Sequence, residues 1–182
     1  MNALLLDLRS DHHHMARIMK LMRYAVNPMI EEQSLEHLEL LGECIEYMTL
    51  FPDNVHHKTE DAIFEQLVKQ DKAAIVYVET LQHEHIELAK KSKEIASLVH
   101  ALQNEHIMSL DNLISLTIEY IDLQTRHMRI EEATVFTLVD QKLDIADWKH
   151  IIKVAPPRQS TPGSRFTQKL ESLQTKYAGI SS

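Results

Sequence analysis

Residues that favour turns and β-strands are scarce in this chain. Its 182 residues include 3 glycines and 5 prolines, and aromatic side chains make up 5% of them. Straight-chain residues such as Leu, Glu, Lys and Met are abundant, and these favour α-helices. A chain of this length can bury the core of one domain. The composition therefore predicts a globular domain of the all-α class.

Three further absences narrow the classes of function. Cys44 is the one cysteine, so no internal disulfide can form, and a reducing compartment is the simpler assumption. No segment approaches the roughly 20 apolar residues of a membrane span, and the apolar run 3–6 is too short for a signal peptide. The formal net charge is -8, and no run of Lys and Arg is present to contact phosphates. We therefore expect a cytoplasmic protein that binds neither membranes nor nucleic acid.

Apolar residues recur at three- and four-residue spacing in four long segments, which is the pattern of helices that bury one face. We expect amphipathic helices over residues 2–26, 34–70, 72–103 and 109–141. Short connections join these segments, so successive helices are expected to be antiparallel. The predicted fold is an up-down-up-down four-helix bundle formed by residues 1–142.

Pro28 and Ser34 define the predicted boundary between the first two helices, and Pro52 marks an interruption within the second. Pro28 is expected to end the first helix, because proline disfavours the helical conformation of the residue before it. Ser34 is a suitable N-cap for the second helix. The apolar stripes before and after Pro52 differ by roughly a quarter turn at ~100° per residue. A kink or short break is therefore expected at Pro52.

Residues 143–182 differ in character and are expected to form a C-terminal extension. Residues 148–154 fit a short helix, and residues 155–164 have the composition of a linker. In the segment 166–177, one helical face would carry Phe166, Leu170, Leu173 and Tyr177. We expect this last helix to pack on the bundle or on a protein partner, including a second copy of this chain.

Histidine is the residue in excess, with 12 copies. His12 and His85 lie at the centres of the apolar stripes of the first and third predicted helices, whereas His83 lies on the outer face. In the fourth helix both His127 and Glu131 fall on the stripe. One such histidine would more often be a hydrogen-bonded core residue, but an ionised carboxylate in an apolar core is expensive unless it is paired or bound to a metal. The combination predicts a metal site inside the bundle.

The second predicted helix offers two histidine–carboxylate pairs at i, i+4 spacing, His56 with Glu60 and His57 with Asp61. On a helical wheel at ~100° per residue, Glu60 lies within about 10° of the mean apolar direction and Asp61 about 90° away. His56 and His57 flank that direction equally. The position of the carboxylate favours His56 and Glu60, and His57 with Asp61 remains the alternative.

The two halves of the chain repeat one pattern, an acidic residue before a histidine in one helix and His-x-x-x-Glu in the next. Leu8-Arg-Ser-Asp-His12 resembles Leu81-Gln-His-Glu-His85, and His56-x-x-x-Glu60 resembles His127-x-x-x-Glu131. This repeat predicts a pseudo-twofold site in which two metal ions have similar ligands. Imidazole and carboxylate ligands suit iron, manganese or zinc.

The chain resembles the hemerythrin-like family of HHE cation-binding proteins over roughly residues 4–140. The resemblance lies in Asp11-His12-His13, His56-His57-Lys-Thr-Glu60-Asp61, Glu84-His85 and His127-x-x-x-Glu131-Glu132. It implies two iron ions joined by an oxo or hydroxo bridge, although other divalent metals use the same ligands. The terminal ligands it implies are His12, His56, His85 and His127, and the bridging ligands are Glu60 and Glu131.

One feature departs from the oxygen-carrying hemerythrins, which have a second histidine one turn from the third-helix ligand. The flanking positions here are Leu81 and Ala89. Four histidines for two metals leave each metal an open position for a small ligand such as O2, NO or peroxide. We therefore expect a module that binds or senses O2, NO or redox state, or that handles iron.

Two other classes of function are open at this point. One is a di-iron enzyme that reduces nitric oxide or peroxide, or an iron-cluster repair factor. The other is a metal-free helical interaction protein. Metal content separates the interaction protein from the rest, and turnover with a reductant separates an enzyme from a binding module.

Overall fold

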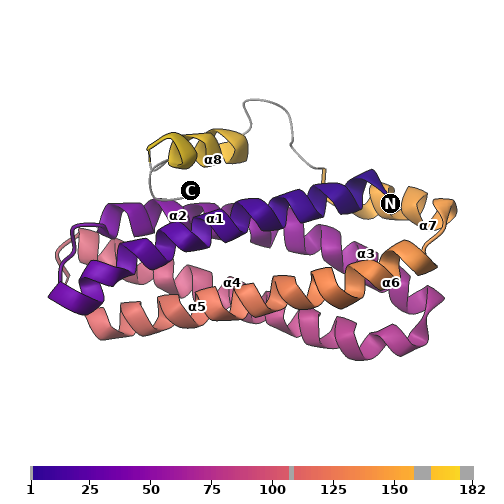
Figure 1. Ribbon diagram of the computed structural model, residues 1–182, viewed down its shortest axis with the longest axis horizontal. Helices are drawn as coiled ribbons and strands as arrows, with labels where there is room; N and C mark the ends of the chain where they lie inside the picture. The colour runs from indigo at the N-terminus through magenta and orange to yellow at the C-terminus, as the bar shows by residue number, and fades with distance from the viewer. Residues whose placement is uncertain (1, 107–108, 158–164, 177–182) are drawn as a thin grey trace.

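The computed structural model describes residues 2–106, 109–157 and 165–176, and every regular element in them is helical. In chain order these are α1 (Ala3–Glu32), α2 (Leu38–Phe51), η1 (Pro52–His56), α3 (His57–Gln70), η2 (Lys72–Ala74), α4 (Ile75–Gln103), α5 (Leu110–Ile130), η3 (Glu131–Val135), α6 (Phe136–Lys142), α7 (Ile145–Val154) and α8 (Arg165–Lys176). The segments α2, η1 and α3 form one continuous rod, and α5, η3 and α6 form another. With α1 and α4 they make four antiparallel rods (Figure 1), which confirms the predicted up-down-up-down bundle.

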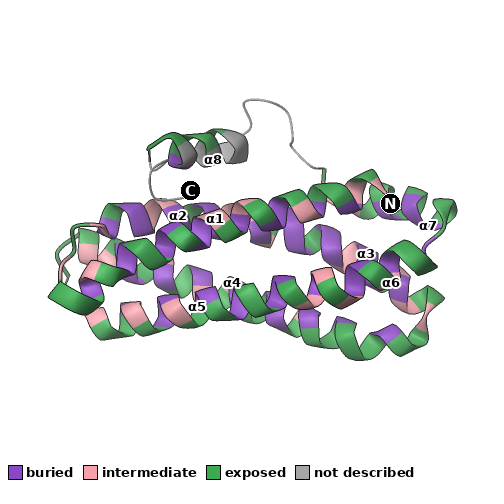
Figure 2. Ribbon diagram, viewed as in Figure 1, coloured by how far each residue is buried: buried purple, intermediate pink, exposed green. Residues whose placement is uncertain are grey.

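The buried side chains form two apolar clusters with a polar layer between them. Along α1, Leu8 belongs to one cluster, His12 to the polar layer and Met15 to the other cluster. The inward faces of all four rods carry the buried residues (Figure 2). The buried polar side chains of the layer include Asp11, His12, His56, His57, Glu60, Glu84, His85, His127 and Glu131. Such a layer destabilises the core unless its groups are paired or bind a metal.

The first connection differs from the prediction at both of its ends. The prediction that Pro28 ends the first helix is wrong, because α1 continues to Glu32 and buries Met29 completely. A proline removes one backbone hydrogen bond, and here the burial of Met29 outweighs that loss. The chain leaves the helix at Gln33, where φ is 53° and the backbone N–H donates to the Pro28 carbonyl.

The predicted N-cap of the second helix is also wrong, because α2 begins at Leu38 rather than after Ser34. The Ser34 hydroxyl accepts a hydrogen bond from the Glu36 N–H within the connecting turn. The longer α1 and the later start of α2 shift the two rods along each other. This shift brings His12 of α1 level with His56 on the neighbouring rod, where their Nε2 atoms are 3.1 Å apart.

The interruption expected at Pro52 is a π-helical turn and not a break. The turn η1 begins at Pro52, which has no N–H to donate to the preceding turn of α2, and the N–H of His57 donates to the Pro52 carbonyl. A π turn contains one residue more than an α turn, which rotates the following helix by about 100°. This rotation supplies the quarter turn that the apolar stripes required.

A second π-helical turn, η3, lies in the fourth rod and begins at Glu131. The sequence predicted one regular helix over residues 109–141, in which Leu138, two turns after the inward Glu131, would also face inward. The extra residue of the π turn moves that face by one position, so Val139 is fully buried and Leu138 is half-buried. Both π turns therefore lie in the two rods that carry a His-x-x-x-Glu motif.

The C-terminal helices pack on the bundle. Asp144 and Asp147 form a capping box at the start of α7, and Gln66 and Gln70 of α3 donate hydrogen bonds of 2.6 and 2.8 Å to Asp147 Oδ1. The helix α8 lies along α2, with Leu173 1% exposed (Figure 1). The predicted last helix therefore contacts the bundle. Most of the predicted linker and Tyr177 lie outside the described residues.

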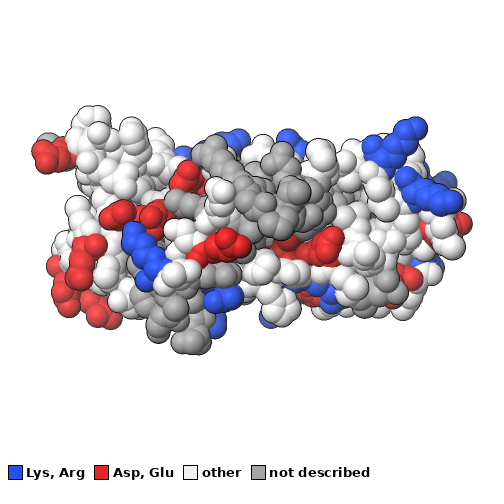
Figure 3. Space-filling view, turned by 90° about the horizontal axis from the view of Figure 1, so that it is seen from above, with Lys and Arg blue, Asp and Glu red and all other residues white. Residues whose placement is uncertain are grey.

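The outer surface carries both signs of charge. On the face in Figure 3, acidic side chains gather toward the end at which α1 and α2 connect, and basic ones toward the opposite end. At the end of α8, Lys176 Nζ lies 3.4 Å from Glu39 Oε1 and 3.3 Å from Glu43 Oε1. Among the described residues, no helix is both long enough and apolar enough to cross a bilayer.

Candidate metal centre

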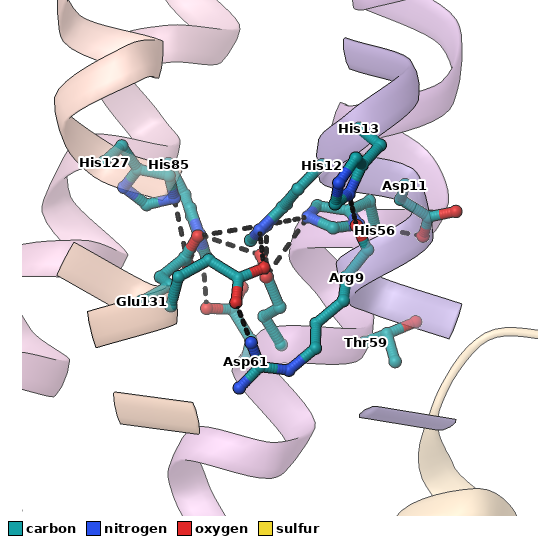
Figure 4. A network of polar contacts seen from close by, with 12 residues as sticks. Arg9, Asp11, His12, His13, His56, Thr59, Asp61, His85, His127 and Glu131 are labelled. Atoms are coloured by element: carbon teal, nitrogen blue, oxygen red, sulfur yellow. Dashed lines mark hydrogen bonds and ion pairs between the residues drawn. The ribbon is translucent and has the colours of Figure 1, made fainter. Parts of the chain in front are cut away.

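The six residues predicted as ligands meet in the polar layer, one or two from each rod. All six are buried, and the most exposed of them, His85, has 6% of its surface accessible. Figure 4 shows the rings of His12 and His56 on one side of this layer and those of His85 and His127 on the other. The structure therefore brings together the full set His12, His56, Glu60, His85, His127 and Glu131.

The two carboxylates lie between the two pairs of histidines. Glu60 Oε1 is 3.1 Å from His56 Nε2 and 3.4 Å from His12 Nε2. Its other oxygen, Oε2, is 3.5 Å from His85 Nε2. One carboxylate thus presents one oxygen to each histidine pair.

Glu131 has the complementary arrangement. Its Oε2 lies 3.3 Å from His12 Nε2, and its Oε1 lies 3.1 Å from His127 Nε2 and 3.7 Å from His85 Nε2. Both carboxylates therefore span the layer from the His12 side to the His85 side. Two carboxylates in this orientation can each bridge a pair of metal ions, with one oxygen on each ion.

The outer nitrogen of each of these four histidines is held by a further carboxylate. In each case the Nδ1 atom lies 3.0 Å from a carboxylate oxygen on a neighbouring rod, and the pairs are His12 with Glu132, His56 with Asp11, His85 with Asp61 and His127 with Glu84. An Nδ1–H that donates to a carboxylate leaves the Nε2 lone pair free for a metal. Arg9 pairs with Glu132, and Arg126 pairs with Glu84.

These outer contacts follow the internal repeat of the sequence. The acid before the helix-α1 histidine, Asp11, holds the histidine of the next rod, and Glu84 of α4 does the same for His127. The acid after each inner glutamate, Asp61 or Glu132, holds a histidine of α4 or α1 in return. The pseudo-twofold arrangement predicted from the sequence is present in the described contacts.

The buried groups shift one another's pKa values. Burial lowers the pKa of His12, but hydrogen bonds with Glu131 and Glu132 outweigh this and hold it well above 6.5. Burial likewise opposes the charged form of His127, whose pKa the neighbouring Glu131 raises to about 9. Burial would raise the pKa of Glu60, yet the adjacent histidines hold it well below 4.5. The layer thus favours ionised carboxylates beside imidazolium groups when no metal is bound.

Several inner atoms lack hydrogen bonds of good geometry. Among the described residues, these buried atoms include both oxygens of Glu60 and of Glu131 and the Nε2 atoms of His57, His85 and His127. Buried polar groups are seldom left in this state. Donor atoms of two groups lie within 4.8 Å of one another, one group formed by His12, His56 and Glu60 and the other by His57, Glu60, His85 and His127. The residues present fit a pair of metal ions.

A comparison with known protein families agrees with this geometry. Residues 4–139 match the family model described as the hemerythrin HHE cation binding domain. The chain belongs to this family. A comparison with curated proteins gives no significant match. The HHE domain covers all four rods of the bundle, and its last matched residue, Val139, lies in α6.

Within the HHE domain, the sequence left open whether His56 with Glu60 or His57 with Asp61 faces the metal layer. His56 and Glu60 face the centre of the layer, whereas the Asp61 side chain is 38% exposed and contacts only the outer nitrogen of His85 among the contacts described. His57 is nevertheless 4% exposed and lies in the layer as well. On a wheel of ~100° per residue the two histidines flank the inward direction equally, and in the structure both enter the layer at the π turn η1.

The positions of His83 and His85 give a direct test of this layer. His85→Ala should lose at least half of the bound metal and destabilise the HHE domain by about 2–5 kcal/mol, as large-to-small changes in a core do. His83 is exposed, so His83→Ala should change neither quantity. Metal analysis and thermal unfolding of both purified variants check this prediction. Equal effects of the two changes would contradict the orientation of α4.

Proposed function

We propose that this HHE domain is a non-haem di-iron protein, with His12, His56, His85 and His127 as terminal ligands and Glu60 and Glu131 as bridges. The observation that supports this most directly is the placement of the two carboxylates, each with one oxygen toward each histidine pair. A single zinc ion in a tetrahedral site would need no such double bridge. Paired iron or manganese ions in helical bundles use this combination of carboxylate and imidazole.

The proposed role is the binding or sensing of a small diatomic molecule such as O2 or NO. Two apolar clusters enclose the layer from either end, so a ligand bound there is shielded from bulk water. The donor set leaves a coordination position for such a ligand, because two carboxylate bridges and four imidazoles do not saturate two metals. Iron supplies the reversible redox chemistry, and the residues of the layer hold and orient it.

Metal content and the optical spectrum of aerobically purified protein test this proposal. We expect about two iron atoms per chain and charge-transfer bands in the near ultraviolet. Addition of azide or NO should shift these bands, because a small anion or diatomic occupies the open position.

Two results would contradict the di-iron proposal. One is a single zinc per chain in the purified protein. The other is absence of bound metal after anaerobic loading with ferrous iron. If iron is bound, assays with a reductant and either NO or peroxide distinguish binding from turnover, and sustained consumption of NO or peroxide would favour an enzyme.

A further inference from the structure

A fifth histidine, His57, lies in the polar layer in addition to the four proposed as terminal ligands. His57 is the first residue of α3 and follows the π turn η1 directly. Its side chain is buried, although the Lys58 side chain that follows it is exposed. The extra residue in the π turn allows His56 and His57 to enter the layer side by side.

The ring of His57 completes a set of three imidazoles on one side of the layer. It stacks on the His85 ring, with centroids 4.3 Å apart and planes 16° apart, and meets the His127 ring edge-on at 5.8 Å. The rings of His85 and His127 are themselves 4.8 Å apart. A donor atom of His57 lies within 4.8 Å of donor atoms of Glu60, His85 and His127.

The two nitrogens of His57 have the environments expected of a ligand. Nε2 is buried without a hydrogen bond in the described residues. Nδ1 faces Asp53 Oδ1 at 3.7 Å, and the Ser92 hydroxyl donates to the other oxygen of Asp53 at 3.2 Å. This carboxylate on the outer nitrogen repeats, at a longer distance, the arrangement of the four other histidines. A histidine that merely filled the core would leave Nε2 unsatisfied.

The opposite side of the layer, beside His12 and His56, has two imidazole rings where the His85 side has three. His12 and His56 are 4.9 Å apart, and the aromatic neighbour stacked on His12 is Phe136, which cannot bind a metal. On the α4 rod, the positions one turn from His85 are Leu81 and Ala89. An additional ligand for the His85 side therefore has to come from another rod, and α3 provides it.

We propose that His57 is a fifth imidazole ligand, so that the metal beside His85 and His127 has three histidines and the metal beside His12 and His56 has two. This inference rests on the proposed di-iron function. It implies that the two metals are inequivalent despite the internal repeat of the sequence.

Mössbauer spectroscopy of the iron-loaded full chain tests the inequivalence without any assay of activity. The wild-type protein should show two quadrupole doublets of equal area, one for each environment. His57→Phe keeps a ring against His85 but removes both nitrogens. This variant should lose its difference between the two doublets or lose one iron, and a chelator should extract its iron at least about 10-fold faster, since even changes of outer contacts cost that much in affinity.

His57→Ala with and without added imidazole is the second arm, which keeps the test valid if the phenylalanine variant fails to fold. Free imidazole should restore the two-doublet spectrum, because it can enter the space left by the side chain. The exposed His83→Ala is the matched control and should match the wild-type protein. Two irons with an unchanged two-doublet spectrum in both His57 variants would overturn this inference alone. A wild-type protein without a pair of metals would overturn the proposed function and this inference with it.

Discussion

Replacing Glu60 by alanine should strip the metal pair from the protein, whereas replacing the adjacent Asp61 should weaken binding without abolishing it. Glu60 presents both oxygens to the interior, one toward each histidine pair, and has no surface exposed to water. In the proposed di-iron site, its loss would remove one bridging carboxylate and with it part of the negative charge that offsets the charges of the two metal ions. We expect less than half of the wild-type iron content after gel filtration.

Asp61→Ala is a matched control because it removes a carboxylate one residue along the same helix. Asp61 contacts the Nδ1 atom of His85 at 3.0 Å and orients that ring. Removing such an outer contact costs about 10–100-fold in metal affinity, so the variant should still bind two metals when iron is in excess. Both variants are purified side by side under the same iron supply. If Asp61→Ala loses its metal while Glu60→Ala retains it, the assignment of Glu60 as a bridge is wrong.

Helical periodicity predicted the fold and the inward residues wherever the helices are regular. In α4 it placed His85 inward and His83 outward, and the structure confirms both positions. It failed at Pro28, because the burial of Met29 is a property of tertiary packing that a local rule for proline does not contain. It failed at Ser34 for the same reason, since the position of α2 depends on where α1 ends.

The π turns are the second feature that helical periodicity could not predict. A helical wheel assumes 3.6 residues per turn throughout, so it detected a change of phase at Pro52 but did not identify its form. The wheel also treated His56 and His57 as alternatives. In the structure they are not alternatives, because both histidines enter the layer at the π turn η1. The signal available in the sequence was the phase change itself, which coincides with the His-His pair.

Removing the metal should make the stability of the protein strongly dependent on pH. In the metal-free layer the carboxylates raise the pKa of His12 and His85 well above 6.5 and that of His127 to about 9. A histidine whose pKa is raised on folding stabilises the fold fully below its unfolded value of 6.5 and loses this contribution as pH rises through the folded value. The Tm of the metal-free protein should therefore fall between pH 6.5 and about 9.

Metal binding should reverse this trend, because the ligands must be deprotonated and protons compete with the metal. At a thousandfold excess over its dissociation constant the metal stabilises the fold by about 4 kcal/mol, which corresponds to about 8–16 °C in Tm for a chain of this size. The difference in Tm between metal-loaded and chelator-treated protein should widen from pH 6.5 toward pH 9. Calorimetry of both forms across this range measures it, and parallel curves would show that the histidines of the layer neither titrate nor bind the metal.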